Sequence, residues 1–282
     1  MPGANRPGGS PRLWMANHPV TAFLIPAIGL TWAAQILSIL ILGTILPGLL
    51  AELLILLGSA VLVTAAAEGR SGVRRLFGRT IRWRAGVGWY AVVLLALPVL
   101  TLLLAAATGT LRGPDGGWAP VIGMYLLQTI VLGAILGNIW EELAWAGVVQ
   151  RRLMERHGLL AGSLLTAIPF ALIHLPMAFG ASGFTATPAD QVLLSWVVLV
   201  VFAPFFRCLV GITYLGTGGS ILLVGLLHAS FNSSGGMPMA GGWQQIVAVA
   251  LLLAAVAAVQ RYRGTRARRA GPQPQTSGPA AR

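Results

Sequence analysis

Residues 119–147 read APVIGMYLLQTIVLGAILGNIWEELAWAG, and this stretch sets the interpretation of the whole chain. From Ala119 to Trp140 there is no charged residue, and two adjacent carboxylates, Glu141 and Glu142, then follow. An apolar run of about 20 residues is long enough to cross a bilayer as a helix. An ionisable side chain in such a run is costly, and two carboxylates side by side oppose each other's ionisation. A chain that keeps both glutamates is expected to use them.

The composition extends this interpretation to the whole chain. Of the 282 residues, 56% are hydrophobic and only 9% are charged, whereas roughly a quarter are charged in soluble domains. We therefore predict an all-α, polytopic membrane protein, with about eight transmembrane helices around a polar intramembrane cavity. The predicted spans are Val20–Ile45, Leu49–Ala67, Val87–Thr108, Ala119–Gly147, Leu159–Phe179, Val192–Leu215, Ile221–Ser234 and Trp243–Gln260.

The charges predict the topology of these spans in a cell membrane. Arginines cluster after the second and fourth spans and after the last one, and the positive-inside rule assigns such segments to the cytoplasm. Both termini are then cytoplasmic: an N-terminal segment 1–18 without a cleavable signal peptide, a membrane domain 19–260, and a basic, disordered tail 261–282. Residues 70–84 fit either an amphipathic helix in the interface or a basic loop.

The net charge of +12 does not require a nucleic-acid partner, because arginines that flank spans also contact anionic lipid. The expected partners are the bilayer and a peptide or protein substrate, and no oligomeric state is favoured. The single cysteine, Cys208, excludes an internal disulfide and a cysteine-based zinc cluster. Pro47 and Gly48 predict a tight turn between the first two spans. Glu52 follows in the first turn of the second span, where we expect the outer interface to solvate it.

Two histidine motifs lie in later spans. His174 follows Phe170 by one helical turn, so the ring of Phe170 can pack against the imidazole. His228 and Asn232 are four residues apart, share a helix face, and could together stabilise an oxyanion. The ordinary alternatives are an interior histidine held by hydrogen bonds and a polar clasp between helices. For the glutamate pair, the alternative is simple solvation among the lipid headgroups.

Taken together, these polar side chains are expected to face one another inside the membrane. Strong polar groups on three separate helices are most easily satisfied by facing one another. The set contains a base, a second acid, two imidazoles and an amide donor, which fits peptide hydrolysis by an activated water. A metal site of the histidine and glutamate type also fits by ligand chemistry. The candidate residues are Glu141, Glu142, His174, His228 and Asn232.

These motifs resemble those of the CPBP family of intramembrane proteases, also called the Abi or CAAX-protease-like family, which includes the type II CAAX prenyl endopeptidases. The family pattern is a glutamate pair with an arginine after three further residues, then Phe-x-x-x-His, then His-x-x-x-Asn. The matching residues are Glu141–Glu142, Phe170–His174 and His228–Asn232, and the approach Tyr214–Ser220 is also similar. The similarity extends over roughly residues 118–235, which form the predicted core.

The resemblance implies an eight-helix fold whose cavity is reached from the cytoplasm and the membrane. It also implies an endopeptidase in which Glu141 and His174 activate water, His228 and Asn232 stabilise the oxyanion, and Glu142 supports the site. No cofactor is expected on this interpretation. A divalent metal such as zinc, held by Glu141, His174 and His228, is the alternative.

The chain departs from the family pattern at one position. The arginine of the pattern falls at Ala146, four residues after Glu142, where it could have paired with that carboxylate. Without this arginine, we expect the negative charge of Glu142 to be less fully compensated. We hypothesise that Arg207, at a similar depth in the sixth span, takes over this role, because a helix rises about 1.5 Å per residue. Arg151 and Arg152 are expected to lie beyond the membrane boundary.

Two alternatives to the peptidase remain open. A catalytically impaired family member could bind hydrophobic peptides or partners, and Ala146 is the main support for this hypothesis. A proton-coupled transporter would also explain buried glutamates and histidines. The transporter is less favoured, because the sequence shows neither an inverted repeat nor broken helices.

Overall fold

The computed structural model describes the backbone of residues 11–269 and the side chains of residues 11–259. All regular elements in that range are helices, and the described residues form no strand beyond an isolated bridge between Leu111 and Met239. The predicted all-α class is therefore confirmed.

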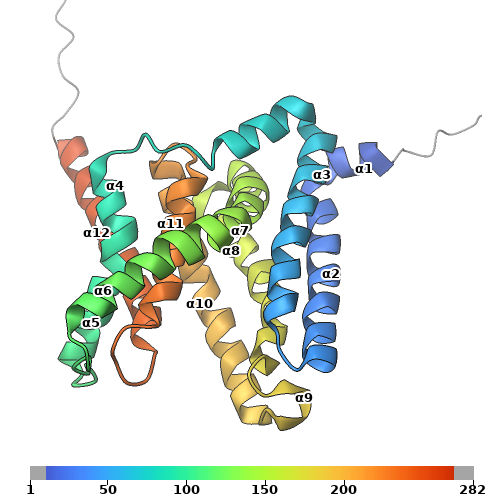
Figure 1. The fold of residues 1–282 in the computed structure, drawn as a ribbon. Helices are drawn as coiled ribbons and strands as arrows, with labels where there is room; N and C mark the ends of the chain where they lie inside the picture. The colour runs from blue at the N-terminus through green and yellow to red at the C-terminus, as the bar shows by residue number, and fades with distance from the viewer. Residues whose placement is uncertain (1–10, 270–282) are drawn as a thin grey trace, which may run out of the picture.

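The chain folds into helices of very unequal length (Figure 1). In chain order, the elements are α1 (Pro11–Asn17), α2 (Pro19–Leu42), α3 (Leu46–Gly78), α4 (Val87–Ala91), the π-helix η1 (Val92–Ala96), α5 (Leu97–Ala107), α6 (Trp118–Leu126), the π-helix η2 (Leu127–Asn138), α7 (Ile139–Ala144), the π-helix η3 (Trp145–Gln150), α8 (Arg151–Ile173), the 3-10 helix η4 (Leu175–Phe179), α9 (Gly183–Ala186), α10 (Ala189–Gly216), α11 (Ile221–Ser234) and α12 (Gln244–Arg269).

Five helical segments of the described chain are long and apolar enough to cross a membrane. They are Pro19–Leu42, Leu46–Gly78, Val87–Ala107, Trp118–Phe179 and Ala189–Gly216, with shorter apolar helices at Ile221–Ser234 and Gln244–Val259. The segment Trp118–Phe179 has 62 residues and includes two of the predicted spans. The protein is thus a polytopic membrane protein, while the count of eight spans remains a prediction.

Two glycines divide the helices α3 and α8 close to the boundaries of predicted spans. Gly158 has φ 79° within α8, and Gly69 has φ 66° within α3. A side chain disfavours this left-handed region, which glycine adopts readily. Gly158 therefore separates the fourth predicted span from the fifth. Residues 70–78 continue as a helix beyond Gly69, which favours the interfacial helix over a basic loop for that part of residues 70–84.

Two predicted boundaries are wrong. The turn between α2 and α3 is not at Pro47 and Gly48, because Gly43 caps α2 in the left-handed conformation and α3 has already begun at Leu46. Proline is well tolerated in the first turn of a helix, so Pro47 begins α3 without breaking it. At the other end, α12 extends to Arg269, into the tail 261–282 that was predicted to be disordered. The rest of that tail, 270–282, lies outside the described residues.

The centre of the fold depends on close helix contacts. A Cβ atom placed on Gly225 of α11 would lie 2.9 Å from Cα of Ile139, the first residue of α7. Small residues allow helix backbones to approach in this way in a membrane. This approach places α11, with its histidine motif, against the helix that holds the glutamate pair.

Replacing Gly225 with Ala is therefore expected to destabilise the protein by about 1–3 kcal/mol, the usual cost of an overpacked core. The measurement is thermal unfolding in detergent. Gly58→Ala is the matched control, because a Cβ at Gly58 meets nothing within 4 Å, and alanine is up to about 1 kcal/mol more favourable than glycine within a helix. Equal unfolding temperatures for the two variants would contradict the close contact.

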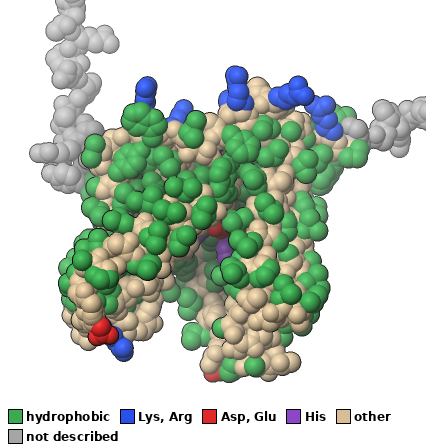
Figure 2. All heavy atoms as spheres, viewed as in Figure 1, with side chains coloured by type: hydrophobic (Ala, Val, Ile, Leu, Met, Phe, Trp, Pro, Cys, Tyr) green, Lys and Arg blue, Asp and Glu red, His purple; other side chains and the backbone are tan. Residues whose placement is uncertain are grey.

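Figure 2 shows that most arginine side chains visible on this face lie along one edge of the molecule. Hydrophobic side chains are spread over the rest of this face, as expected where lipid would contact the protein. The face is hollowed near its centre, and acidic and histidine side chains are visible inside the hollow. The hollow extends toward the edge opposite the arginines.

Candidate active site

Glu142 on α7 is completely buried and fully paired. Nη1 of Arg207 donates to both of its carboxylate oxygens, at 2.8 and 3.0 Å, and His228 Nδ1 lies 2.9 Å from Oε1. The predicted pairing with Arg207 is therefore present. The expectation that Ala146 leaves Glu142 less compensated is wrong, because α10 supplies the charge that α7 lacks.

Arg207 is itself held in place by a residue that sequence analysis did not single out. Gln150 Oε1 accepts hydrogen bonds from Nε of Arg207, at 2.8 Å, and from its Nη2. The Gln150 amide donates in turn to the Arg207 carbonyl oxygen at 2.7 Å and to Ser163 Oγ at 3.0 Å. The Arg207 guanidinium also lies over the Phe170 ring, 4.9 Å from its centroid, in cation–π geometry. Its orientation is therefore fixed from several sides.

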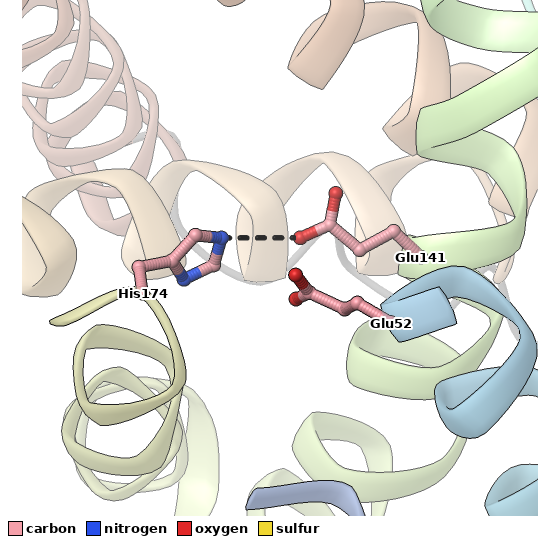
Figure 3. Close-up of side chains that lie close together, drawn as sticks. All are labelled: Glu52, Glu141 and His174. Atoms are coloured by element: carbon pink, nitrogen blue, oxygen red, sulfur yellow. Dashed lines mark ion pairs between the residues drawn. The ribbon is translucent and has the colours of Figure 1, made fainter. Parts of the chain in front are cut away.

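Glu141, the neighbouring carboxylate, is held on one side only. Asn138 Nδ2 donates to its Oε2 at 3.1 Å, whereas the buried Oε1 has no hydrogen-bond partner. Nε2 of His174 lies 3.7 Å from that Oε1, as Figure 3 shows, and Nδ1 of His228 lies 3.8 Å from Oε2. Both distances exceed a direct hydrogen bond, and a water that contacts both atoms of a pair would have to lie beside the line that joins them.

His174 directly follows the last residue of α8. Its Nδ1 lies 2.7 Å from the Phe170 carbonyl oxygen, one turn earlier. A carbonyl can only accept, so Nδ1 carries the hydrogen, and Nε2 of the neutral ring keeps its lone pair. The Phe170 and His174 rings pack with centroids 4.7 Å apart, as the sequence spacing predicts. Nε2 is thus aimed at Glu141 as a base or a ligand atom.

The second histidine motif contributes one residue that contacts the glutamate pair directly and one that is linked to it through another side chain. His228 is buried and contacts Glu142 directly, and the Phe206 ring packs edge-on against it at 4.9 Å. Asn232 is exposed on the same helix, and its Nδ2 lies 3.4 Å from Asn138 Oδ1. Asn138 therefore links Asn232 to Glu141. The structure brings all five candidate residues together, four of them directly and Asn232 through this amide.

Glu52 also belongs to the site, which corrects the expectation that the outer interface solvates it. Only 4% of Glu52 is exposed, and its Oε2 accepts a hydrogen bond from Gln35 Nε2 at 2.8 Å. Its carboxylate ends beside the Glu141–His174 pair (Figure 3). The cause is packing: α3 contacts both α2 and α7, so this part of α3 faces the protein interior. One ligand atom each from Glu52, Glu141 and His174 lies within 4.8 Å of the others.

Three polar residues were thus missed as parts of the site: Gln35, Asn138 and Gln150. Each is a lone amide in an apolar span, which is usually a packing residue. Asn138 stands three residues before Glu141, a spacing that places the two on one helix face, and this signal could have identified it. For Gln35 and Gln150, the partners come from other helices, and no local pattern indicates them.

A comparison with known protein families gives a match over part of the chain. Residues 123–234 match the family described as type II CAAX prenyl endopeptidase Rce1-like. This segment is Rce1-like. The resemblance to the CPBP proteases is thereby confirmed, and at the level of the family it indicates a CAAX-protease-like intramembrane peptidase. The Rce1-like segment includes Asn138 and all five candidate residues, whereas Gln35 and Glu52 precede it. No curated protein matches the chain.

Proposed function

We propose that this protein is an intramembrane endopeptidase in which Glu141 and His174 activate a water molecule. The observation that supports this most directly is the gap of 3.7 Å between His174 Nε2 and the unpartnered Oε1 of Glu141. The two side chains keep 18% and 11% of their surface exposed, although Oε1 of Glu141 is itself buried. Glu142, by contrast, has no exposed surface and no free oxygen.

In the proposed reaction, a water lies beside the pair and contacts both His174 Nε2 and Glu141 Oε1. Glu141 accepts a proton from this water, and the water oxygen attacks the peptide carbonyl carbon. The resulting tetrahedral intermediate carries a negative charge on the former carbonyl oxygen. When the C–N bond breaks, Glu141 returns its proton to the leaving nitrogen, which completes the hydrolysis without a net change in the enzyme.

His228 and Asn232 are proposed to stabilise the oxyanion. In its doubly protonated form, His228 donates from Nδ1 to Glu142 and keeps the hydrogen on Nε2 for the substrate. The contact between Asn232 Nδ2 and Asn138 is long, at 3.4 Å, so that amide can turn toward a stronger acceptor. Donors that are already positioned are most effective where charge develops in the transition state. Glu142 and Arg207 then act as positioning residues for His228.

The paired Glu142 also bears on the impaired-binder alternative. That alternative depended on the absence of an arginine at Ala146, and Arg207 supplies the missing charge at 2.8 Å. This pairing weakens the main support for a purely binding protein. For the topology, we propose that the arginine-rich edge faces the cytoplasm, with both termini on that side. On the face in Figure 2, the hollow then opens toward lipid and extends away from the cytoplasmic edge. We infer that substrate segments enter from the membrane, whereas the family resemblance also implied access from the cytoplasm.

The test is cleavage of a library of membrane-spanning peptides by purified protein in detergent. The wild type is expected to cleave members of the library, and His174→Ala is expected to lower the rate by about 10²–10³-fold, within the usual range for an acid–base residue. His157→Ala is the matched control, because His157 is exposed. Cleavage that survives His174→Ala would remove the proposed mechanism, and a wild type that cleaves no peptide would favour a binding protein.

A further inference from the structure

We propose that residues 79–86 form a binding site for the phosphate-bearing headgroup of an anionic phospholipid. The segment follows α3, which ends at Gly78, and leads into α4, which begins at Val87. It passes beside the start of α11 (Figure 1), along the edge where arginine side chains gather (Figure 2). The site lies outside the proposed peptidase centre, and the inference does not depend on that activity.

A pocket of about 890 Å³ opens between this segment and the turn that follows α10. Arg82, Trp83 and Arg84 line it, and none of the described residues in its lining is acidic. Pockets of roughly 300–1,000 Å³ commonly hold small molecules. A lining that contains two arginines and no carboxylate favours an anionic ligand over a neutral or cationic one.

The two arginines of this pocket have no carboxylate partner. Glu68 pairs with three other arginines, whereas among the described residues no aspartate or glutamate lies within ion-pair distance of Arg82 or Arg84. Arg82 donates from Nη1 to the Gly218 carbonyl oxygen, which leaves its other guanidinium nitrogens available. The N–H groups of a guanidinium match the oxygens of a phosphate in spacing. A bound phosphate would therefore supply the counter-ion that the fold does not provide.

Hydrogen bonds to neighbouring elements hold the segment in shape before any ligand binds. The carbonyl oxygen of Arg82 accepts from Ser220 Oγ at 2.6 Å, and that of Trp83 accepts from the Tyr90 hydroxyl at 2.5 Å. The contact of Arg82 with Gly218 ties the side chain to the opposite wall of the pocket. A site that is already ordered loses less conformational entropy on binding, which raises its affinity.

Exposed apolar side chains favour a lipid as the source of the phosphate. Ile81 is 75% exposed and Trp83 is 63% exposed, and the two flank Arg82 in the chain. The Arg84 guanidinium lies 5.5 Å from the centroid of the Trp83 ring. Tryptophan is enriched at the headgroup level of membranes, where its amphipathic ring fits the interface. A dissolved phosphate would leave Ile81 and Trp83 in water, whereas the acyl chains of a lipid would cover them.

The experiment is native mass spectrometry of the purified protein in detergent, titrated with phosphatidylglycerol or with phosphatidylcholine. The wild type is expected to bind phosphatidylglycerol more tightly, because the choline cation would be repelled by the arginines. The double variant Arg82→Gln, Arg84→Gln is expected to bind phosphatidylglycerol about 25-fold more weakly, at about fivefold for each arginine. The double variant Arg70→Gln, Arg74→Gln is the matched control, because it removes the same charge from exposed positions of α3 outside the pocket. It is expected to bind like the wild type.

Glycerol phosphate, which carries the same phosphate without acyl chains, distinguishes a lipid site from a site for a dissolved anion. It is expected to bind much more weakly than phosphatidylglycerol, and equal affinity for the two would overturn the lipid assignment. An equal loss of affinity in the two double variants would also overturn the proposal, since it would show only a general attraction by arginines.

Thermal unfolding of each variant shows whether it is folded. If the variant that lacks Arg82 does not fold, Arg84→Gln still tests the site, because Arg84 is exposed and the loss expected for it alone is about fivefold. Because the titration uses no peptide, failed lipid binding is distinguishable from failed cleavage.

Discussion

Replacing Glu141 with Gln is expected to lower kcat/KM for peptide cleavage by about 10⁴-fold, the upper end of the range for a general base. The amide has nearly the shape of the carboxylate and can still accept from Asn138 through its oxygen, where Glu141 Oε2 accepts at 3.1 Å. It cannot take a proton from water. The variant should therefore remain folded and lose the chemical step. The measurement is steady-state cleavage of a peptide identified from the library.

Glu155→Gln is the control for this experiment, since Glu155 is exposed on α8 and pairs with Arg151. Its kcat/KM is expected to equal that of the wild type. A Glu141→Gln variant that keeps cleavage within tenfold of the wild type would contradict the role of Glu141 as base. Unfolding temperatures measured on the same samples separate lost chemistry from lost structure.

The second large effect concerns stability. Replacing Arg207 with Met is expected to destabilise the protein by about 3–5 kcal/mol, the usual result of breaking a buried ion pair from one side. Arg207 and Glu142 have no exposed side-chain surface, so the remaining carboxylate would lose its arginine counter-ion, would have no water, and would keep His228 as its partner. The loss of the hydrogen bonds between Arg207 and Gln150 adds to this cost. The measurement is reversible unfolding in mixed detergent micelles.

A surface pair provides the matched control. Arg75 contacts Glu68 at 3.3 Å with 60% of its side chain exposed, and Arg75→Gln should cost less than about 1 kcal/mol. The double variant Glu142→Gln, Arg207→Met should be more stable than Arg207→Met alone, because it leaves no unpaired charge. If Arg207→Met costs no more than Arg75→Gln, the ion pair does not stabilise the fold.

The residues whose roles follow from local spacing could be predicted from the sequence. The glutamate pair, the Phe170–His174 turn and the His228–Asn232 face each depend on neighbours within one turn, and apolar length located the helices. The pairing of Arg207 with Glu142 could also be predicted from the sequence, because a buried charge requires a partner. Arg207 was the available arginine within a neighbouring predicted span.

Glu52 shows where this kind of reasoning fails. Its depth was inferred from its distance to the end of the span, and a carboxylate near a helix end is usually solvated. Which way Glu52 faces depends on how α3 packs against α2 and α7, and on Gln35 as a partner 17 residues away. The same holds for Gln150, whose partner Arg207 is 57 residues away. Neither of these two contacts produces a periodic pattern in the sequence.

The position of the arginine that pairs with Glu142 also has a consequence for how the protein is made. An arginine at Ala146 would lie on the same helix as Glu142 and would enter the bilayer together with it. Arg207 is 65 residues further along the chain. During synthesis, α7 therefore reaches the membrane before its counter-ion exists, and Glu142 acquires its charge partner only when α10 inserts. The proposed catalytic centre would consequently be completed late in biogenesis, after α10 has been made.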